Sequence, residues 1–394
     1  MGRYVCENCF DDYAVEEFIR REAVEMKCDY CEIESETEPI AAPLSDVSRF
    51  IREGIETEWS DPDDEGVPWD SEEGRYMVEV HDTYDLLPDL LSISSDVLMN
   101  DLSGELGDRN WCQRNPARFT EQEELYFNWE AFSEQLKHHT RYVFYRVENE
   151  RDEFDDRSVT PYNILDTIAN LVLDHELLRT LPAGATLIRA RQHREDEAYS
   201  TVKDLGPPPK EKASHANRMS PAGIPMFYGS DMEETALAEI DRSGFATVAN
   251  FKTLKAFQVL DLTRIPGVPS LFDQQMGHQR SAIIFLHNFL EDFAKKVEKD
   301  GREHIEYVPT QVVTEYFRRV FRNRDGDRLG GVIYPSAPVE GGISYVLFFT
   351  NEDCTQDDID EDSNEKWLSM VTSSVKRIDL RAQPPVKNIF RLEG

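Results

Sequence analysis

Two pairs of cysteines near the start of the chain place the strongest constraint on its fold. Cys6 and Cys9 form one pair and Cys28 and Cys31 the other, with two residues inside each pair and eighteen residues between the pairs. Two residues between thiolates let one tight turn present both sulfur atoms to one ion, and two such turns complete a tetrahedron. The pattern predicts a structural zinc site in a module over residues 1–40, in which zinc supplies much of the folding free energy.

The same pattern limits what the metal does. Four thiolates leave no coordination position for a substrate, so we expect a structural rather than a catalytic ion. A redox role is less favoured, because both pairs lie in a polar segment without a surrounding βαβ pattern. The first residues lack the charged-then-apolar pattern of a secretory signal, which indicates a cytoplasmic chain without disulfides, in which Cys112 and Cys354 are inert thiols.

A large excess of acidic residues narrows the choice of partners. The chain has 77 Asp and Glu residues against 43 Lys and Arg, which gives a net charge of −34. Such a surface repels phosphate backbones, so nucleic-acid binding is disfavoured. No stretch of eighteen apolar residues occurs, which argues against a membrane span.

Residues 41–180 are predicted to form a helical bundle. Apolar residues recur at helical spacing in three segments, and Ser45 stands where the N-cap of the first is expected. The acidic segment 61–74, with two prolines and two glycines, is expected to be a loop. The expected helices are residues 45–59, 121–145 and a run that begins at Thr160–Pro161, includes Leu178 and ends before Pro182.

One pair in this region has a spacing used in catalysis. Arg75 and His81 are separated as in the helical HEPN-type ribonucleases, which use an arginine followed closely by a histidine. The residue after Arg75 is an apolar-faced tyrosine instead of a small polar residue, and no second acidic element accompanies the pair. We therefore interpret His81, together with His138 and His139, as surface or packing residues.

From residue 181 onward, short strands and helices mix without a regular βαβ alternation, which predicts an α+β domain with a mixed central sheet. The sequence has no GxGxxG, Walker A, GxSxG or HExxH pattern, so Rossmann, P-loop, α/β-hydrolase and zinc-protease folds have no support. The expected strands are residues 187–191, 330–336, 344–349 and, at the sheet edge, 375–380; the expected helices are residues 235–240 and two runs that begin near residues 281 and 309.

Three segments of this half resemble the RES domain, a family named for its Arg, Glu and Ser. They are Leu187–Arg191, Asn217–Glu239 and Tyr334–Ser336, the last followed by a Gly-Gly pair and an apolar strand. The resemblance covers residues 181–350 and implies a fold similar to ADP-ribosyltransferases. Residues 41–180 resemble the HEPN-like domain that accompanies some RES domains. The expected parts are a zinc module (1–40), a HEPN-like domain (41–180), a RES domain (181–350) and a tail packed on it (351–394).

The resemblance also implies a set of site residues. Arg218 and Tyr228 are expected in the active site, with Glu239 as the key carboxylate and Ser336 as its polar partner. Arg189 matches the arginine of the first strand and is implied to bind NAD. The residues that flank Arg218 depart from the family pattern, since an asparagine precedes it and a methionine follows it. These flanking residues would give the wall of the expected NAD pocket beside Arg218 a different shape from that of other family members.

The chemistry of these residues fits NAD. Cleavage of the nicotinamide–ribose bond builds positive charge on the ribose carbon, which a carboxylate such as Glu239 stabilises. Arginine binds phosphate oxygens bidentately, so Arg189 and Arg218 suit the pyrophosphate. Tyr228 can stack on a flat ring, and Ser336 is an orienting donor, because no histidine base accompanies it.

Three functions stay open at this point. The leading hypothesis is an NAD-consuming enzyme, a glycohydrolase or phosphorylase, that acts as a toxin or phage-defence effector. The second is an ADP-ribosyltransferase that modifies a macromolecule, and the third is a catalytically silent binding or regulatory module. Each residue alone could be a surface or packing residue, whereas their joint order favours an enzyme. We expect a homo-oligomer, with a protein trigger or inhibitor as a possible partner.

Overall fold

The computed structural model describes residues 2–146, 163–240, 243–295, 301–357 and 365–382. The chain divides into two compact units. Unit 1 comprises residues 1–124 and 267–284, and unit 2 comprises residues 125–266 and 285–394. Each unit thus contains parts of the chain that are far apart in the sequence.

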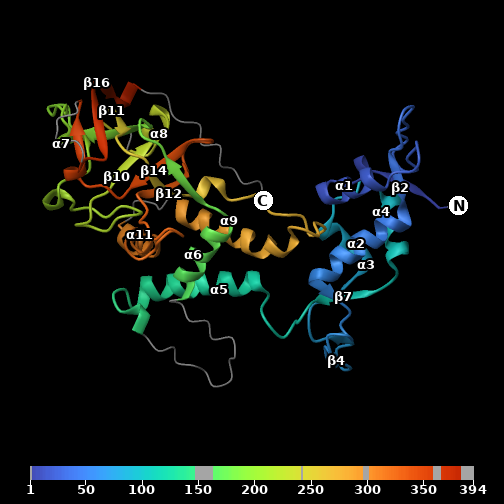
Figure 1. Ribbon diagram of the computed structural model, residues 1–394. Coiled ribbons are helices and arrows are strands. Elements are labelled where there is room, and N and C mark those ends of the chain that lie inside the picture. Colours follow the sequence, from blue (N-terminus) through green and yellow to red (C-terminus); the bar gives the residue numbers. More distant parts are fainter. Residues whose placement is uncertain (1, 147–162, 241–242, 296–300, 358–364, 383–394) are drawn as a thin grey trace. The chain divides into compact units, whose positions relative to one another are not determined.

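Unit 1 combines helices with short strand pairs (Figure 1). Strand β1 pairs antiparallel with β2, β7 lies between β3 and β6, and β4 pairs with β5. The helices are α1 (Tyr13–Glu22), α2 (Leu44–Glu58), α3 (Thr83–Leu90) and α4 (Asp96–Leu106), and the strands are β1 (Tyr4–Cys6), β2 (Ala41–Pro43), β3 (Trp59–Ser60), β4 (Trp69–Asp70), β5 (Arg75–Tyr76), β6 (His81–Asp82) and β7 (Asn110–Gln113).

Helix α2 runs through the core of unit 1. Its residues Val47, Ile51 and Ile55 are fully buried and belong to one apolar cluster. The distant segment 267–284 adds Leu271 and Phe272 to the same cluster. Burial of such side chains contributes roughly 1.5–3 kcal/mol each to folding, so segment 267–284 is part of what stabilises unit 1.

Unit 2 is built on one mixed sheet. Within the described residues its nine strands follow the order β15-β16-β11-β9-β10-β14-β13-β12-β8. The pairs β12–β13 and β15–β16 are parallel, and the other pairs are antiparallel. The strands are β8 (Leu178–Leu181), β9 (Thr186–His193), β10 (Phe227–Ser230), β11 (Phe245–Thr253), β12 (Phe257–Asp261), β13 (Gly331–Pro335), β14 (Ile343–Leu347), β15 (Cys354–Gln356) and β16 (Leu368–Asp379).

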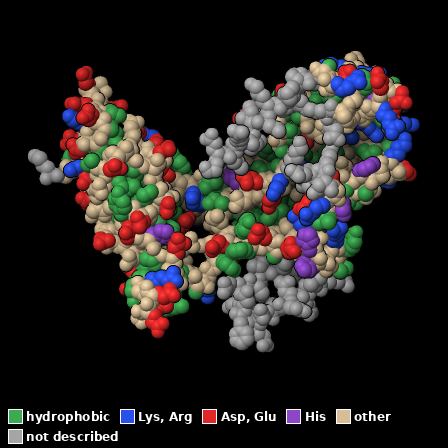
Figure 2. Space-filling view, turned by 180° about the vertical axis from the view of Figure 1, so that it is seen from behind, with side chains coloured by type: hydrophobic (Ala, Val, Ile, Leu, Met, Phe, Trp, Pro, Cys, Tyr) green, Lys and Arg blue, Asp and Glu red, His purple; other side chains and the backbone are tan. Residues whose placement is uncertain are grey.

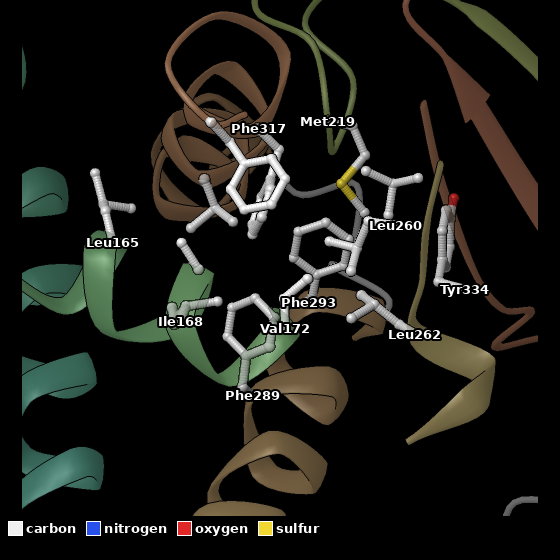
Figure 3. Close-up of a cluster of buried hydrophobic side chains, with 14 of the residues drawn as sticks. Leu165, Ile168, Val172, Met219, Leu260, Leu262, Phe289, Phe293, Phe317 and Tyr334 are labelled. Carbon is white, nitrogen blue, oxygen red and sulfur yellow. The ribbon is translucent and has the colours of Figure 1, made fainter. Parts of the chain in front are cut away.

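Helices cover one face of this sheet over a single large core (Figures 1 and 3). Phe289 and Phe293 from α9, Phe317 from α11 and Ile168 from α6 pack together with strand residues such as Leu260. The helices of unit 2 are α5 (Glu121–Glu134, which begins in unit 1) with a π-helical continuation (Gln135–His139), α6 (Ile164–Asp174), α7 (Val202–Leu205), α8 (Glu233–Ala238), α9 (Arg280–Ala294, which also begins in unit 1), α10 (Glu303–Glu306) and α11 (Val308–Arg319).

A second apolar layer covers the opposite face. Phe227, Phe251, Ile333 and Leu347 point into it, and Leu205 of α7 packs against it. Neighbouring residues along a strand point to opposite faces, so Phe227 and Tyr228 belong to different layers. This alternation decides which side chains can meet at a site.

The structure corrects several expected elements. Helix α2 begins at Leu44, with Pro43 in the cap position and no side-chain cap, so Ser45 is not its N-cap. Helix α6 ends at Asp174, and Leu178 opens strand β8 instead of continuing the helix. Residues 375–380 fall largely in β16 and pair with β11, whereas β15 pairs only with Leu368, Ser369 and Met370 of β16. Among the described residues this end of β16 therefore has a partner strand on one side, as expected of an edge.

Other expected elements are found with small shifts. The helix expected over 121–145 ends at His139. The helices expected between residues 41 and 180 divide between the two units instead of forming one bundle. The start signal Thr160–Pro161 lies outside the described residues.

Within the described part of the chain, no helix is long and apolar enough to cross a membrane. Acidic side chains are scattered over the face shown in Figure 2.

Candidate active site

Glu239 is the first residue after α8, a short helix that directly follows strand β10. Its backbone N–H donates to the carbonyl of Thr235 and so closes the last turn of the helix. The residue itself is exposed. The end of the helix therefore fixes the backbone position of Glu239, and its side-chain carboxylate remains accessible to a ligand.

Two serine hydroxyls hold this carboxylate by a single oxygen. Ser336 Oγ donates to Glu239 Oε1 at 3.0 Å, and Ser344 Oγ donates to the same atom at 3.1 Å. Both serines are buried. Ser344 lies on β14, and Ser336 directly follows β13, where its N–H donates to the Gly342 carbonyl. Two donors on one oxygen fix the orientation of the carboxylate and leave Oε2 outside these two bonds.

Tyr228 lies on β10 with its side chain on the helix-covered face. Its hydroxyl is within 2.9 Å of Ser220 Oγ. Burial raises the pKa of Tyr228 to about 12, against the opposing effects of the Ser220 hydroxyl and the Met219 amide. The phenol is therefore a neutral donor at ordinary pH.

Arg218 lies in a tight turn whose ends bond to each other. Asn217 N–H donates to the Ser220 carbonyl at 2.8 Å, and Ser220 N–H donates back at 3.2 Å. The guanidinium of Arg218 donates through Nη1 to the carbonyl of Ala294, the last residue of α9. A cation at a helix C-terminus is favourable, because the last carbonyls carry partial negative charge.

Tyr334 connects these groups electrostatically. It lies on β13, opposite Ser344, and is buried on the helix-covered face (Figure 3). Burial raises the pKa of Tyr334, the negative charge of Glu239 raises it further, and the positive charge of Arg218 lowers it. Tyr334 therefore lies near enough to both Glu239 and Arg218 to be affected by their charges.

Arg189 is not brought into this group. On the neighbouring strand β9, Ile188 pairs with Ser230, which points to the same face as Tyr228, so Arg189 points to the opposite face. Its guanidinium lies 5.2 Å from the centre of the Phe227 ring and donates through Nη1 to the Tyr228 carbonyl at 2.8 Å. Burial lowers its pKa to about 10. Its role in binding NAD stays a prediction.

Two members of the site were not identified from the sequence. In the sequence, Tyr334 belongs to a Tyr-Pro-Ser segment and Ser344 begins an expected strand, and neither position by itself indicates a role in the site. Both belong to the site because Tyr334 and Ser344 face each other across β13 and β14. The available signal was the short connection between these strands, which predicts a hairpin that places the two ends side by side.

The four N-terminal cysteines form a separate cluster in unit 1. Their sulfur atoms all lie within 4.8 Å of one another, with Cys6–Cys9, Cys6–Cys31 and Cys9–Cys28 at 3.9, 3.3 and 3.7 Å. Tetrahedral zinc with bonds of about 2.3 Å requires sulfur atoms about 3.8 Å apart. The cysteines are free thiols, so their geometry fits one tetrahedral ion.

These features define a mixed α/β protein in which two tyrosines of the sheet lie near a carboxylate at the end of α8 and an arginine of the turn before β10. Comparison with protein families identifies the domains. The family model described as RES domain matches residues 186–368, and the model described as HEPN/RES N-terminal domain 1 matches residues 21–150. The chain is therefore a RES-domain protein with a HEPN/RES N-terminal domain. No curated protein and no solved structure matches it.

Proposed function

We propose that this protein consumes NAD by cleaving the bond between nicotinamide and ribose. The RES domain links the chain to NAD chemistry. The observation that carries the proposal is the Glu239 carboxylate, exposed yet held by the hydroxyls of Ser336 and Ser344 through one oxygen. A fixed carboxylate with one oxygen outside those bonds suits a sugar on which positive charge develops.

In the proposed reaction the C1′–N bond breaks, and its electron pair moves to the ring nitrogen of nicotinamide, which leaves as a neutral molecule. The ribose carbon becomes electron-deficient, and Glu239 stabilises it and binds the ribose hydroxyls. An acceptor oxygen then forms the new bond to that carbon and releases its proton. With water as the acceptor the product is ADP-ribose, and with phosphate it is ADP-ribose 1″-phosphate.

The other residues bind and orient the dinucleotide in this proposal. Arg218 contributes N–H donors for pyrophosphate oxygens, because its bond to the Ala294 carbonyl uses Nη1 and a guanidinium has five N–H groups. Tyr228 presents a neutral phenol ring for stacking on a flat base. Ser336 acts as an orienting donor to Glu239 and not as a nucleophile.

The test compares NAD loss by purified wild-type protein and by Glu239→Gln, with and without phosphate, with products resolved by chromatography. Glutamine keeps an acceptor for both serines but removes the charge. We expect kcat to fall roughly 100- to 1,000-fold. Glu234→Ala, an exposed acid on the same helix, is the matched control and should retain activity.

Three outcomes separate the alternatives. Free ADP-ribose or its phosphate supports a glycohydrolase or a phosphorylase, respectively. Transfer of label from NAD to added protein or nucleic acid would instead support an ADP-ribosyltransferase. No NAD loss by the wild type, also with candidate protein triggers present, would exclude the proposal and favour a silent binding module. Equal NAD loss by the wild type and Glu239→Gln would show instead that cleavage does not depend on the Glu239 carboxylate.

We further propose that Cys6, Cys9, Cys28 and Cys31 hold one zinc ion. Support comes from their mutual distances and from burial of Cys6, Cys9 and Cys28, which together match a closed structural site. Thiolate ligands and a closed tetrahedron favour zinc over the oxygen-preferring ions. The ion would stabilise the turns that connect β1, α1 and β2.

The cellular role we propose is a cytoplasmic toxin or defence effector controlled by a protein trigger or inhibitor. Loss of NAD is harmful to any cell, which is a reason to couple the RES domain to a second domain. Induced expression should lower cellular NAD and stop growth, while Glu239→Gln expressed at the same level should do neither. We expect the protein to act as a homo-oligomer, which a measurement of molar mass in solution tests.

A further inference from the structure

The first two turns of α11 carry three polar side chains where a core-facing helix normally carries apolar ones. Thr310, Gln311 and Thr314 are buried, and Val313 and Phe317 of the same helix join the apolar core. Buried hydroxyl and amide groups cost free energy unless they are hydrogen-bonded. Their partners therefore indicate why they are placed there.

All three side chains reach one short segment, the turn that carries Arg218. Thr310 Oγ1 donates to the Arg218 carbonyl at 2.7 Å, and Gln311 Nε2 donates to the Asn217 carbonyl at 2.7 Å. Each threonine hydroxyl also has an acceptor within its own helix or at the helix N-cap, the Tyr307 carbonyl at 2.9 Å for Thr310 and the Thr310 carbonyl at 2.7 Å for Thr314. Thr314 Oγ1 in addition lies 3.4 Å from the sulfur of Met219. Helix α11 thus contacts three consecutive residues of the turn, two of them through backbone carbonyls.

The side chain of Arg218 is anchored from another direction. Its Nη1 donates to the Ala294 carbonyl at the end of α9, as described above. Its charge acts on both Tyr228 and Tyr334, whose pKa values it lowers against the larger effect of burial. Fixing the backbone of the turn therefore also fixes where this positive charge lies relative to Glu239 and the two tyrosines.

We propose that Thr310 and Gln311 are positioning residues that hold Arg218 ready for the pyrophosphate of the dinucleotide. This inference rests on the proposed function. A guanidinium that is ordered before binding loses less conformational entropy when it engages phosphate oxygens. Removing a bond to the turn should therefore weaken NAD binding more than it slows the chemical step.

The test is a double-mutant cycle on NAD cleavage. Thr310→Val keeps the shape of the side chain and removes the hydroxyl. We expect kcat/KM to fall about tenfold, mainly through KM, with kcat within about twofold of wild type. Thr310→Ser, which keeps the hydroxyl, should restore kcat/KM to within about twofold. Gln311→Met should resemble Thr310→Val and serves if that variant does not fold.

The second arm of the cycle separates positioning from general stability. In an Arg218→Ala background, Thr310→Val should cause no further loss of kcat/KM, because the residue through which it acts is absent. The same factor of loss in both backgrounds would overturn the inference. The control Val313→Ala removes a fully buried side chain from the same helix and should lower Tm without raising KM.

The outcomes distinguish this inference from the proposed function. If wild type consumes NAD but Thr310→Val and Gln311→Met leave KM unchanged, the positioning role is wrong and the proposed function stands. If wild type consumes no NAD under any condition, the proposed function fails and the positioning role falls with it.

Discussion

At the scale of single residues, the arrangement around Glu239 combines order with access. A surface glutamate usually samples several rotamers, and ordering it costs conformational entropy. The Glu239 side chain loses this conformational entropy when the protein folds, before any ligand binds, because Ser336 and Ser344 both donate to Oε1. A ligand that meets the second oxygen would find it already oriented, which is the condition under which electrostatic stabilisation of a transition state is most effective.

This arrangement predicts the effect of removing each donor. Ser336→Ala or Ser344→Ala deletes one of the two bonds to Glu239 Oε1, and we expect kcat to fall about tenfold for each. Because the two serines share one acceptor, their effects are coupled. The fold-reduction in kcat of the double variant should therefore differ from the product of the two single reductions. Single-turnover NAD cleavage measures these rates. Ser71→Ala, at an exposed position in unit 1, is the control.

The ionisation state of Tyr228 gives a pH prediction. Its pKa is raised to about 12 by burial, so the phenol is protonated at every pH below about 10, and the stability that this gives is lost as pH rises from 10 through 12. The profile of kcat/KM between pH 6 and 9 should therefore keep its shape in Tyr228→Phe. Disappearance of a basic limb in that variant would contradict the assignment of Tyr228 as a neutral donor.

The candidate site residues differ in how clearly the sequence indicates them. Arg218, Tyr228, Glu239 and Ser336 stand in a recognisable order along the chain, and the structure places all four on or beside the helix-covered face. The sequence signal for Ser344 is the short connection that predicts a hairpin of β13 and β14, and this signal does not give the register. The contact of Ser344 with Glu239 depends on that register, which is set by long-range contacts that a local pattern does not contain.

At the scale of elements, the sheet of unit 2 is weakly joined between β9 and β10. Strand β9 pairs with β11 over eight residues, but with β10 through the single pair Ile188–Ser230. Where the backbone ladder ends, the guanidinium of Arg189 donates to the Tyr228 carbonyl. Arg189 therefore connects the two parts of the sheet by a side chain in place of a backbone bond.

This predicts a structural effect of Arg189. Arg189→Met should leave the Tyr228 carbonyl without that donor and lower the free energy of unfolding by about 1–3 kcal/mol. Urea denaturation followed by circular dichroism measures the change, with the exposed Arg194→Met as the control. An unchanged stability with a raised KM for NAD would instead support the cofactor-binding role expected from the sequence.

The cysteine module predicts a metal-dependent element. Purified protein should contain about one zinc per chain by mass spectrometry of the metal, and Cys6→Ser with Cys28→Ser should lose it. A chelator should lower the Tm of unit 1, because the thiolates then lack their counter-ion. Cys112→Ala, a buried thiol of unit 1 outside the cluster, should keep full metal content. Full metal content in the double variant would place the ion elsewhere.

Most elements follow from local pattern, and the failures have physical causes. Helical spacing located α2, α5, α9 and α11, because an amphipathic helix repeats its apolar face every turn. Leu178 fits the same helical spacing but belongs to β8. There its backbone pairing with β12 contributes more stability than helix propensity would. Residues 375–380 form the end of β16 that pairs with β11, and the three residues of β16 that pair with β15 lie at its other end, so the edge position expected from the sequence holds among the described residues.

At the scale of the whole molecule, the two compact units are not two continuous stretches of the chain. Segment 267–284 belongs to unit 1, although it is flanked on both sides by parts of unit 2. Inside unit 1, Tyr13 donates to Asp273 at 2.7 Å and accepts from Ser270 N–H at 3.2 Å. No composition shift marks this segment, so the sequence did not reveal that residues of the second half complete the first unit.

The packing of Phe272 against α2 makes this arrangement testable. At Gly54 an added Cβ would lie 2.4 Å from Phe272 Cδ1 and 3.3 Å from Phe272 Cα, so the ring and its backbone would have to shift. Gly54→Ala should therefore lower the free energy of unfolding of unit 1 by about 1–3 kcal/mol, although alanine is the better helix former. Gly104→Ala, in helix α4 with nothing within 4 Å of its new Cβ, should be neutral or slightly stabilising.

A second substitution identifies the cause of that loss. If the strain comes from segment 267–284, then Phe272→Ala costs stability by itself, but Gly54→Ala costs little more in its presence, since the atoms that it would meet are gone. Denaturation followed by tryptophan fluorescence measures all four proteins, because Trp111 is buried in the same cluster. Additive losses would mean that the cost of Gly54→Ala does not come from the Phe272 side chain, which would contradict the packing of this ring against α2.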